Sequence, residues 1–358
     1  MERNSTVKRI GLVLTEAVLL IIFVWFLNRL FMPKYVSENR DGRISREYYK
    51  EKLDTDIIFV GSSTVYSGIN PIILWEDKGY TSYDRSNASQ TMWTSYYMIE
   101  DAIRYNKPKL VALDVGFIKY DDDFTEEPSN RKAIDGMRLS SSKIKCIEAA
   151  KGEEERLIEY IFPVLRFHTR WKEFKLEDLI YTFKDEEVTN NGFIIDPKRT
   201  KNLPPRENGR YIHGEEVDIS PKNWEYLMKI INICRENDVE LFLMKVPSYS
   251  DNWSLKYDRL IDELGEEYGI SYLNFDELDE TIGFDYLIHS PDEGSHLNTE
   301  GAELFTYYLG DYIEENYNIP SHRGEEKYEE VWGKKSRRYK EMLALAIEKN
   351  LEEERNSK

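Results

Sequence analysis

The sequence contains few of the residues that build metal and redox centres. Its 358 residues include only 2 cysteines and 5 histidines. Cys146 and Cys234 form no C-x-x-C pair, and no His/Cys cluster has the spacing of metal ligands. We therefore predict two buried free thiols, no metal site and no cofactor.

An excess of positive charge is also missing. The 49 lysine and arginine residues are outnumbered by 67 aspartate and glutamate residues, which gives a net charge of −18. Because binding to phosphates needs a cationic face, nucleic acid is not an expected partner. The hydrophobic fraction of 41% is enough for a core, and the length allows one large α/β domain with an insertion, or two domains.

The chain has one long apolar run. Residues 11–31 read GLVLTEAVLLIIFVWFLNRLF, close to the roughly 20 apolar residues that span a bilayer. Arg3, Lys8 and Arg9 precede this run, and no small-residue cleavage site follows closely. We therefore predict an uncleaved signal anchor within residues 1–34, with the amino end inside the cell. A charged stalk at 35–55 and an extracytoplasmic domain are expected to follow.

Strand and helix patterns alternate through the rest of the chain. We predict strands at 57–60, 81–84, 110–115, 239–247 and 270–274, with helices at 72–78, 91–105, 221–237, 255–268 and 299–317. Such an alternation is typical of a parallel sheet covered by helices. It stops between about 120 and 215, which we interpret as an insertion or lid. The domain would cover 56–318, and 319–358 would be a charged, mostly solvated helical tail.

The first predicted strand leads into Gly61-Ser62-Ser63-Thr64, which places a serine at the carboxyl edge of the sheet. A serine hydroxyl is a weak nucleophile and needs a base. The best base is His296, which follows Asp292 by four residues and Glu293 by three. Either carboxylate could orient the imidazole, so the sequence indicates a serine-hydrolase set of Ser, His and an acid.

These stretches resemble the SGNH (GDSL-type) hydrolase superfamily, over about residues 50–318. The resemblance is closest to a membrane-anchored branch found beside membrane-bound O-acyltransferases in Gram-positive bacteria. It implies a flavodoxin-like three-layer α/β/α sandwich with a parallel sheet, in addition to the transmembrane helix. The matching stretches are 59–71 (FVGSSTVYSGINP), 89–90 (SQ), 96–97 (YY), 107–109 (KPK), 113–115 (LDV), 167–171 (FHTRW) and 296–302 (HLNTEGA).

The resemblance also implies roles for individual residues. The superfamily's nucleophile falls on Ser63 and its base on His296. The Asp-x-Gly-x-His pattern of the branch selects Asp292 as the orienting acid, while the strict Asp-x-x-His spacing would select Glu293. The family's oxyanion hole uses the nucleophile's N–H, a glycine N–H and an asparagine amide. Residues 84–90 contain no glycine, so the candidates here are Ser63, Asn87 and Gln90, together with a backbone N–H from one of residues 86–89.

The function that the resemblance implies is an extracytoplasmic serine esterase or O-acyltransferase. Its substrates would be acyl esters, acetyl above all, of a cell-envelope polysaccharide or related polymer, and a membrane-bound O-acyltransferase would be a partner. His168 and Arg170, in the FHTRW stretch, are candidates for contacting substrate, although His168 also fits a structural role. The alternative function is a non-catalytic protein of the same fold that docks an acyltransferase or binds glycan.

Overall fold

A five-stranded parallel sheet with the order β2-β1-β3-β4-β5 organises the domain. The computed structural model describes residues 2–33, 45–183, 190–205, 218–251 and 253–356. The 2-1-3-4-5 order is the flavodoxin-like one, so the predicted fold class is confirmed. Each strand corresponds to a predicted one: β1 (Ile57–Gly61), β2 (Ser82–Ser86), β3 (Leu110–Asp114), β4 (Glu240–Lys245) and β5 (Ser271–Asn274).

Helices cover both faces of the sheet. The side chains of β1 alternate between two cores, as the two-residue period of a strand requires. Ile58 and Val60 pack in the core beneath α5, α11 and α12, whereas Ile57 and Phe59 pack in the core beneath α3, α4 and α15. These helices are α3 (Ser63–Gly68), α4 (Pro71–Lys78), α5 (Met92–Asn106), α11 (Pro221–Glu236), α12 (Leu255–Tyr268) and α15 (Thr299–Asn316).

Local capping explains where several of these helices begin. The side chain of Asn70 accepts the backbone N–H of Ile72 at 3.0 Å, and Pro71 occupies the first turn of α4. Ser220 caps α11 in the same way, with Pro221 as its first residue. The remaining short helices between β5 and α15 are η4 (Phe275–Leu278), α13 (Asp279–Ile282) and α14 (Tyr286–His289).

The predicted insertion forms helices that pack beside the sheet. Cys146 and Ile147 of α7 are fully buried in the core that α5 shares, and both Cys146 and Cys234 are buried free thiols, as predicted. Among the described residues of the predicted insertion, Tyr120 lines the cavity next to Ser63 and residues 121–205 do not, so the lid interpretation stays a prediction. The segment comprises α6 (Glu127–Ile134), α7 (Ser141–Ala150), α8 (Leu157–Ile161), α9 (Val164–Phe167), η3 (His168–Glu173) and α10 (Leu176–Phe183), and follows η2 (Gly116–Lys119).

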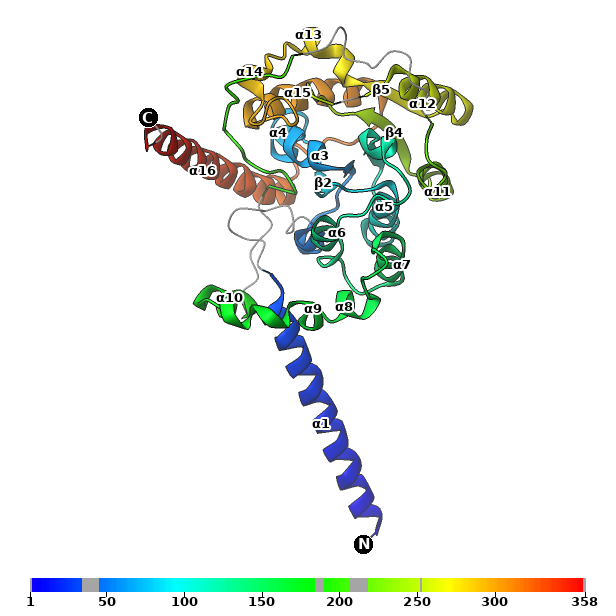
Figure 1. Cartoon of the computed structure of the whole chain (residues 1–358), viewed down its shortest axis with the longest axis vertical. Coiled ribbons are helices and arrows are strands. Elements are labelled where there is room, and N and C mark those ends of the chain that lie inside the picture. Colours follow the sequence, from blue (N-terminus) through cyan, green and yellow to red (C-terminus); the bar gives the residue numbers. More distant parts are fainter. Residues whose placement is uncertain (1, 34–44, 184–189, 206–217, 252, 357–358) are drawn as a thin grey trace.

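The amino-terminal helix α1 (Glu2–Phe31) extends away from the domain (Figure 1). Its stretch Val7–Phe31 is long and apolar enough to cross a membrane, with a mean hydropathy of 2.6 and none of that window buried. Residues 35–44 of the predicted stalk lie outside the described part of the chain. The rest of the stalk prediction is wrong, because Tyr48 of η1 (Tyr48–Lys50) is fully buried against Tyr83 of β2.

The carboxyl-terminal segment is only half solvated. Helix α16 (Glu326–Asn356) buries Tyr328, Trp332 and Tyr339, and Trp332 stacks on Trp75 of α4 with ring centroids 5.3 Å apart. The predicted helix is therefore present, but its first half belongs to the domain. The periodic aromatic residues decide this, because burying them on α4 is more favourable than exposing them to water.

Candidate active site

Ser63 lies at the carboxyl end of β1, where the chain turns into α3. Ser62 is the extended residue that precedes the helix, and Ser63 is its first residue. Gly61 makes this turn possible, because a Cβ there would come within 2.6 Å of Val65 Cγ2 and 2.7 Å of Asp114 Cβ. The carboxyl ends of parallel strands next to a change in strand order are the usual ligand site of such folds. β1 is that position here, since β2 lies on one side of it and β3 on the other.

Gly61→Ala should destabilise the chain by about 1–3 kcal/mol, the usual result of forcing an extra methyl group into a packed site. The measurement is thermal unfolding of the full chain in detergent. Gly116→Ala is the matched control, because its Cβ would meet its nearest neighbours, the Asp114 carboxylate oxygens, only at 3.4 Å. Equal melting temperatures for the two variants would contradict the close approach at Gly61.

A tight loop before α15 brings the acid and the base together. Gly294 has φ +92 and Glu293 has φ +59, both in the left-handed region. A Cβ at Gly294 would lie 2.4 Å from Tyr249 Cβ, so only glycine fits. The hydroxyl of Ser290 accepts the Gly294 N–H at 2.9 Å, and Asp292 Oδ1 accepts the backbone N–H of His296 at 2.9 Å. The loop therefore folds Asp292 back beside the imidazole.

The structure brings Ser63, His296 and Asp292 into one hydrogen-bonded chain. His296 Nε2 lies 2.7 Å from Ser63 Oγ, and His296 Nδ1 lies 2.5 Å from Asp292 Oδ2. The side chain of His296 is 30% exposed and that of Asp292 is 45% exposed. Glu293 is exposed to solvent. With Nδ1–H donated to Asp292, the Nε2 lone pair faces the serine hydroxyl, which is the geometry for removing its proton.

A cavity of about 600 Å³ opens beside Ser63 and His296. Hydroxyl and charged side chains predominate in its lining, and a few aromatic rings accompany them. The cavity therefore offers a ligand hydrogen-bonding groups together with apolar surface. Its lining residues are Ser62, Ser63, Thr64, Asp114, Gly116, Phe117, Lys119, Tyr120, Lys245, Ser248, Ser250, Asp251, Ser254, Tyr257, Ser295 and His296.

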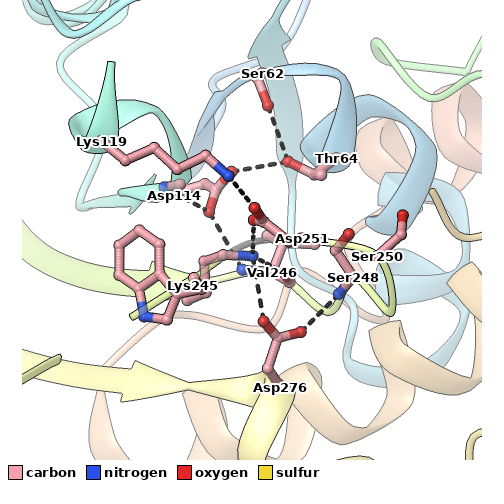
Figure 2. Close-up of polar contacts among 12 residues, drawn as sticks. Ser62, Thr64, Asp114, Lys119, Lys245, Val246, Ser248, Ser250, Asp251 and Asp276 are labelled. Atoms are coloured by element: carbon pink, nitrogen blue, oxygen red, sulfur yellow. Dashed lines mark hydrogen bonds and ion pairs between the residues drawn. The ribbon is translucent and has the colours of Figure 1, made fainter. Parts of the chain in front are cut away.

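Asp114, at the end of β3, ties the serine turn to the neighbouring strands (Figure 2). Thr64 Oγ1 donates to Asp114 Oδ2 at 2.8 Å, and the backbone N–H of Val246 donates to Asp114 Oδ1 at 3.2 Å. Burial raises the pKa of the Asp114 carboxyl above its ordinary value, while Lys245 and these hydrogen bonds act against the rise. The strand ends of β1, β3 and β4 are thus fixed relative to one another next to Ser63.

Alternating charges continue along the cavity wall (Figure 2). Lys245, with a side chain only 1% exposed, pairs with Asp251 at 2.9 Å and with Asp276 at 3.4 Å. Lys119 pairs with the other oxygen of Asp251. The sequence reasoning missed Lys119, Lys245 and Asp251. Lys245 could have been found from the sequence, because it is a charged residue at the end of a predicted buried strand. That end lies at the carboxyl edge of the sheet, where Ser63 was also expected.

The predicted oxyanion residues do not all gather at this site. Ser63 does, and its backbone N–H lies in the first turn of α3, where N–H groups have no acceptor within the helix. Asn87 and Gln90 are buried but do not line the cavity. Asn87 Nδ2 donates to Ser45 Oγ at 3.2 Å, and Gln90 Nε2 donates to the Arg85 carbonyl at 3.2 Å. The geometry therefore does not support these two amides as oxyanion donors.

His168 and Arg170 also lie away from the cavity. His168 Nδ1 is 2.9 Å from the carbonyl oxygen of Leu165, and Arg170 donates to the carbonyl of Phe31 at 2.8 Å and to Asp178 at 3.2 Å. Both belong to η3, which Arg170 links to Phe31, the last residue of α1. The structure therefore does not support their prediction as substrate contacts, and it leaves the FHTRW stretch without a role in the site.

The chain is similar to several solved structures. No protein-family profile matches the chain, and no curated protein matches it. Similar solved structures include a GDSL-like lipase from Bacteroides thetaiotaomicron, at 10% identity and a TM-score of 0.36, covering 77% of this chain and 98% of that one. A protein from Desulfitobacterium hafniense, assigned as a lipolytic member of the G-D-S-L family, has 12% identity and a TM-score of 0.36. The match covers 72% of this chain and 99% of that one. An assigned acylhydrolase from Bacteroides fragilis has 9% identity and a TM-score of 0.36. The match covers 79% of this chain and 98% of that one.

Proposed function

We propose that the chain is a membrane-anchored serine esterase or O-acyltransferase that acts through an acyl-enzyme. The observation that supports this is the Ser63–His296–Asp292 chain, with both of its links at hydrogen-bond distance. A nucleophile, a base within reach and a carboxylate that orients the base are the three parts that acyl transfer needs.

The reaction follows from this geometry. Ser63 Oγ attacks the ester carbonyl while His296 Nε2 takes the hydroxyl proton, and Asp292 stabilises the imidazolium that forms. The Ser63 N–H donates to the oxygen that becomes negative. His296 then returns the proton to the leaving alcohol, so the acyl group stays on Ser63. A water or sugar hydroxyl, deprotonated by His296, attacks this ester and frees the serine.

The proposed substrate is an acyl ester, acetyl above all, of a cell-envelope polysaccharide or related polymer. The cavity supports it, because its hydroxyl groups and the charged pairs around Asp251 can hydrogen-bond a polyhydroxylated alcohol. The experiment is ester hydrolysis by the full chain in detergent, with acetylated polysaccharide and with p-nitrophenyl esters of increasing chain length. We expect acetate release from the polysaccharide and a fall in rate beyond short acyl chains. No turnover of any ester would contradict the proposal.

One observation favours the alternative of a non-catalytic protein that docks a membrane O-acyltransferase or binds glycan. The amides of Asn87 and Gln90 are hydrogen-bonded inside the protein, which leaves the Ser63 N–H as the one predicted oxyanion donor at the site among the described residues. Reaction with a fluorophosphonate distinguishes the two functions, because it requires an activated serine. Labelling supports the enzyme, and its absence supports the docking function.

We propose that residues 11–31 anchor the chain and that the domain lies outside the cytoplasmic membrane. The support is the exposed apolar helix α1 with Arg3, Lys8 and Arg9 at its amino end. Protease added to intact protoplasts should therefore remove the domain, as followed by an antibody to α16. Protection of the domain until the protoplasts are lysed would reverse the orientation.

A further inference from the structure

The segment of residues 164–183, which contains the FHTRW stretch, has no part in the proposed reaction. It consists of α9, η3 and α10, and crosses the end of α1 where that helix meets the domain (Figure 1). We call it the 164–183 segment. Its surface is unusual in both hydrophobicity and charge, and the two features point to the same occupant.

Helix α10 turns its apolar face away from the protein. Leu176, Leu179, Ile180 and Phe183 follow the i, i+3, i+4, i+7 spacing of one helical face. All four are exposed, Leu176 by 70% and Phe183 by 68%. The inward residues are polar instead: Asp178 accepts from Arg170, and Thr182, fully buried, donates to the carbonyl of Asp178. A helix on a water-facing surface has the opposite arrangement.

The exposed face continues into the apolar surface of α1. Phe183 contacts Phe26 with ring centroids 5.8 Å apart, and Phe174 contacts Phe31 at 4.8 Å. Arg170 donates to the carbonyl of Phe31, the last residue of α1, which helps to hold η3 at the helix end. At 1.5 Å per residue the 25-residue apolar window is about 37 Å long, somewhat more than the ~30 Å of a bilayer core. The end of α1 therefore reaches the headgroup level, and the 164–183 segment with it.

The charge of this segment is opposite to that of the whole chain. Residues 164–183 contain four lysine or arginine residues and three acidic residues, a net charge of +1 in a protein of net charge −18. Lys172 and Lys175 are exposed, and so is Trp171, by 62%. Exposed tryptophan and leucine next to lysine are the composition of helices that lie in the interface of a bilayer, where anionic lipids attract the lysines.

We propose that the 164–183 segment lies in the headgroup region of an anionic lipid bilayer, with the apolar face of α10 inserted beside α1. This proposal rests on the proposed anchoring by α1 but not on catalysis. A bilayer accounts for both observations, because it offers hydrocarbon to Leu176 and Phe183 and negative charge to Lys172 and Lys175. The contact would hold the domain at a fixed orientation on the membrane, instead of leaving it to swing on α1.

The experiment places an environment-sensitive nitrobenzoxadiazole label on Leu176→Cys in the full chain, reconstituted in phosphatidylcholine–phosphatidylglycerol vesicles. Leu345→Cys is the matched control, since Leu345 is 65% exposed on α16, apart from α1 in Figure 1. Cys146 and Cys234 are buried, and the parent protein gives the background labelling. We expect blue-shifted emission that brominated acyl chains quench at position 176, and neither effect at position 345. Vesicles of phosphatidylcholine alone should reduce the quenching.

Several results would overturn the proposal. A label at 176 that is as polar as the one at 345 means that the face does not enter lipid. A blue shift without quenching by brominated lipid means that a second copy of the chain covers the face. Quenching that is the same with and without phosphatidylglycerol means that anionic lipid does not contribute to the contact. Failure of the protein to float with the vesicles would instead overturn the anchor, and loss of esterase activity alone would leave these readouts unchanged.

Discussion

Ser63→Ala should abolish covalent labelling by a fluorophosphonate and reduce acetyl-ester turnover by about 10⁶-fold, the loss that removal of a nucleophilic serine causes in a serine protease. The reason is that Ser63 Oγ is the hydroxyl within 2.7 Å of the base, His296 Nε2. Removing it leaves His296 without a nucleophile to activate. Labelling is read by in-gel fluorescence of the full chain, and turnover by release of p-nitrophenol.

Ser62→Ala is the control for this variant. Ser62 Oγ lies 3.0 Å from Thr64 Oγ1, and its exposed fraction is only 4%. Its loss should change labelling little, because the hydroxyl is not the partner of His296. Survival of labelling in Ser63→Ala together with its loss in Ser62→Ala would exchange the roles of the two serines.

Asp292→Asn should lower turnover by about 10⁴-fold while the fold stays intact, as neutralising the orienting acid does in a serine protease. Asp292 Oδ2 accepts the Nδ1 proton of His296 at 2.5 Å. An asparagine NH₂ in that place favours the tautomer with the proton on Nε2, so the nitrogen facing Ser63 can no longer act as a base. The measurement is kcat for an acetyl ester, with thermal unfolding to confirm an unchanged fold.

Glu293→Gln tests which of the two carboxylates, Asp292 or Glu293, orients His296, a choice that the sequence left open. Glu293 is exposed, and glutamine keeps its length and its backbone demand at φ +59. The variant should therefore retain nearly full activity. If Glu293→Gln were inactive and Asp292→Asn active, glutamate would be the acid and the observed loop would not be the working one. Full activity in both variants would show that neither carboxylate is needed to orient His296.

Local patterns predicted most of the elements. Strands such as 57–60 and 110–115 are short apolar runs bounded by turns, so their burial follows from composition. Asn70-Pro71 and Ser220-Pro221 mark helix starts because capping and proline geometry act within one turn. The stalk and tail were misjudged for the opposite reason. Tyr48 and Trp332 stand in charged sequence, and only the distant surfaces of Tyr83 and Trp75 bury them.

The sequence by itself determined the apolar span, the serine after the first strand and the Asp-x-Gly-x-His loop, because each depends on residues close together in the chain. Only the tertiary structure decided that Ser63 and His296, 233 positions apart, meet at 2.7 Å. Only the tertiary structure showed that Asn87 and Gln90 form hydrogen bonds inside the protein, away from the cavity. It also showed that His168 and Arg170 lie near the end of α1. Strand order and the packing of distant helices set those positions, and neither is encoded in any local window of sequence.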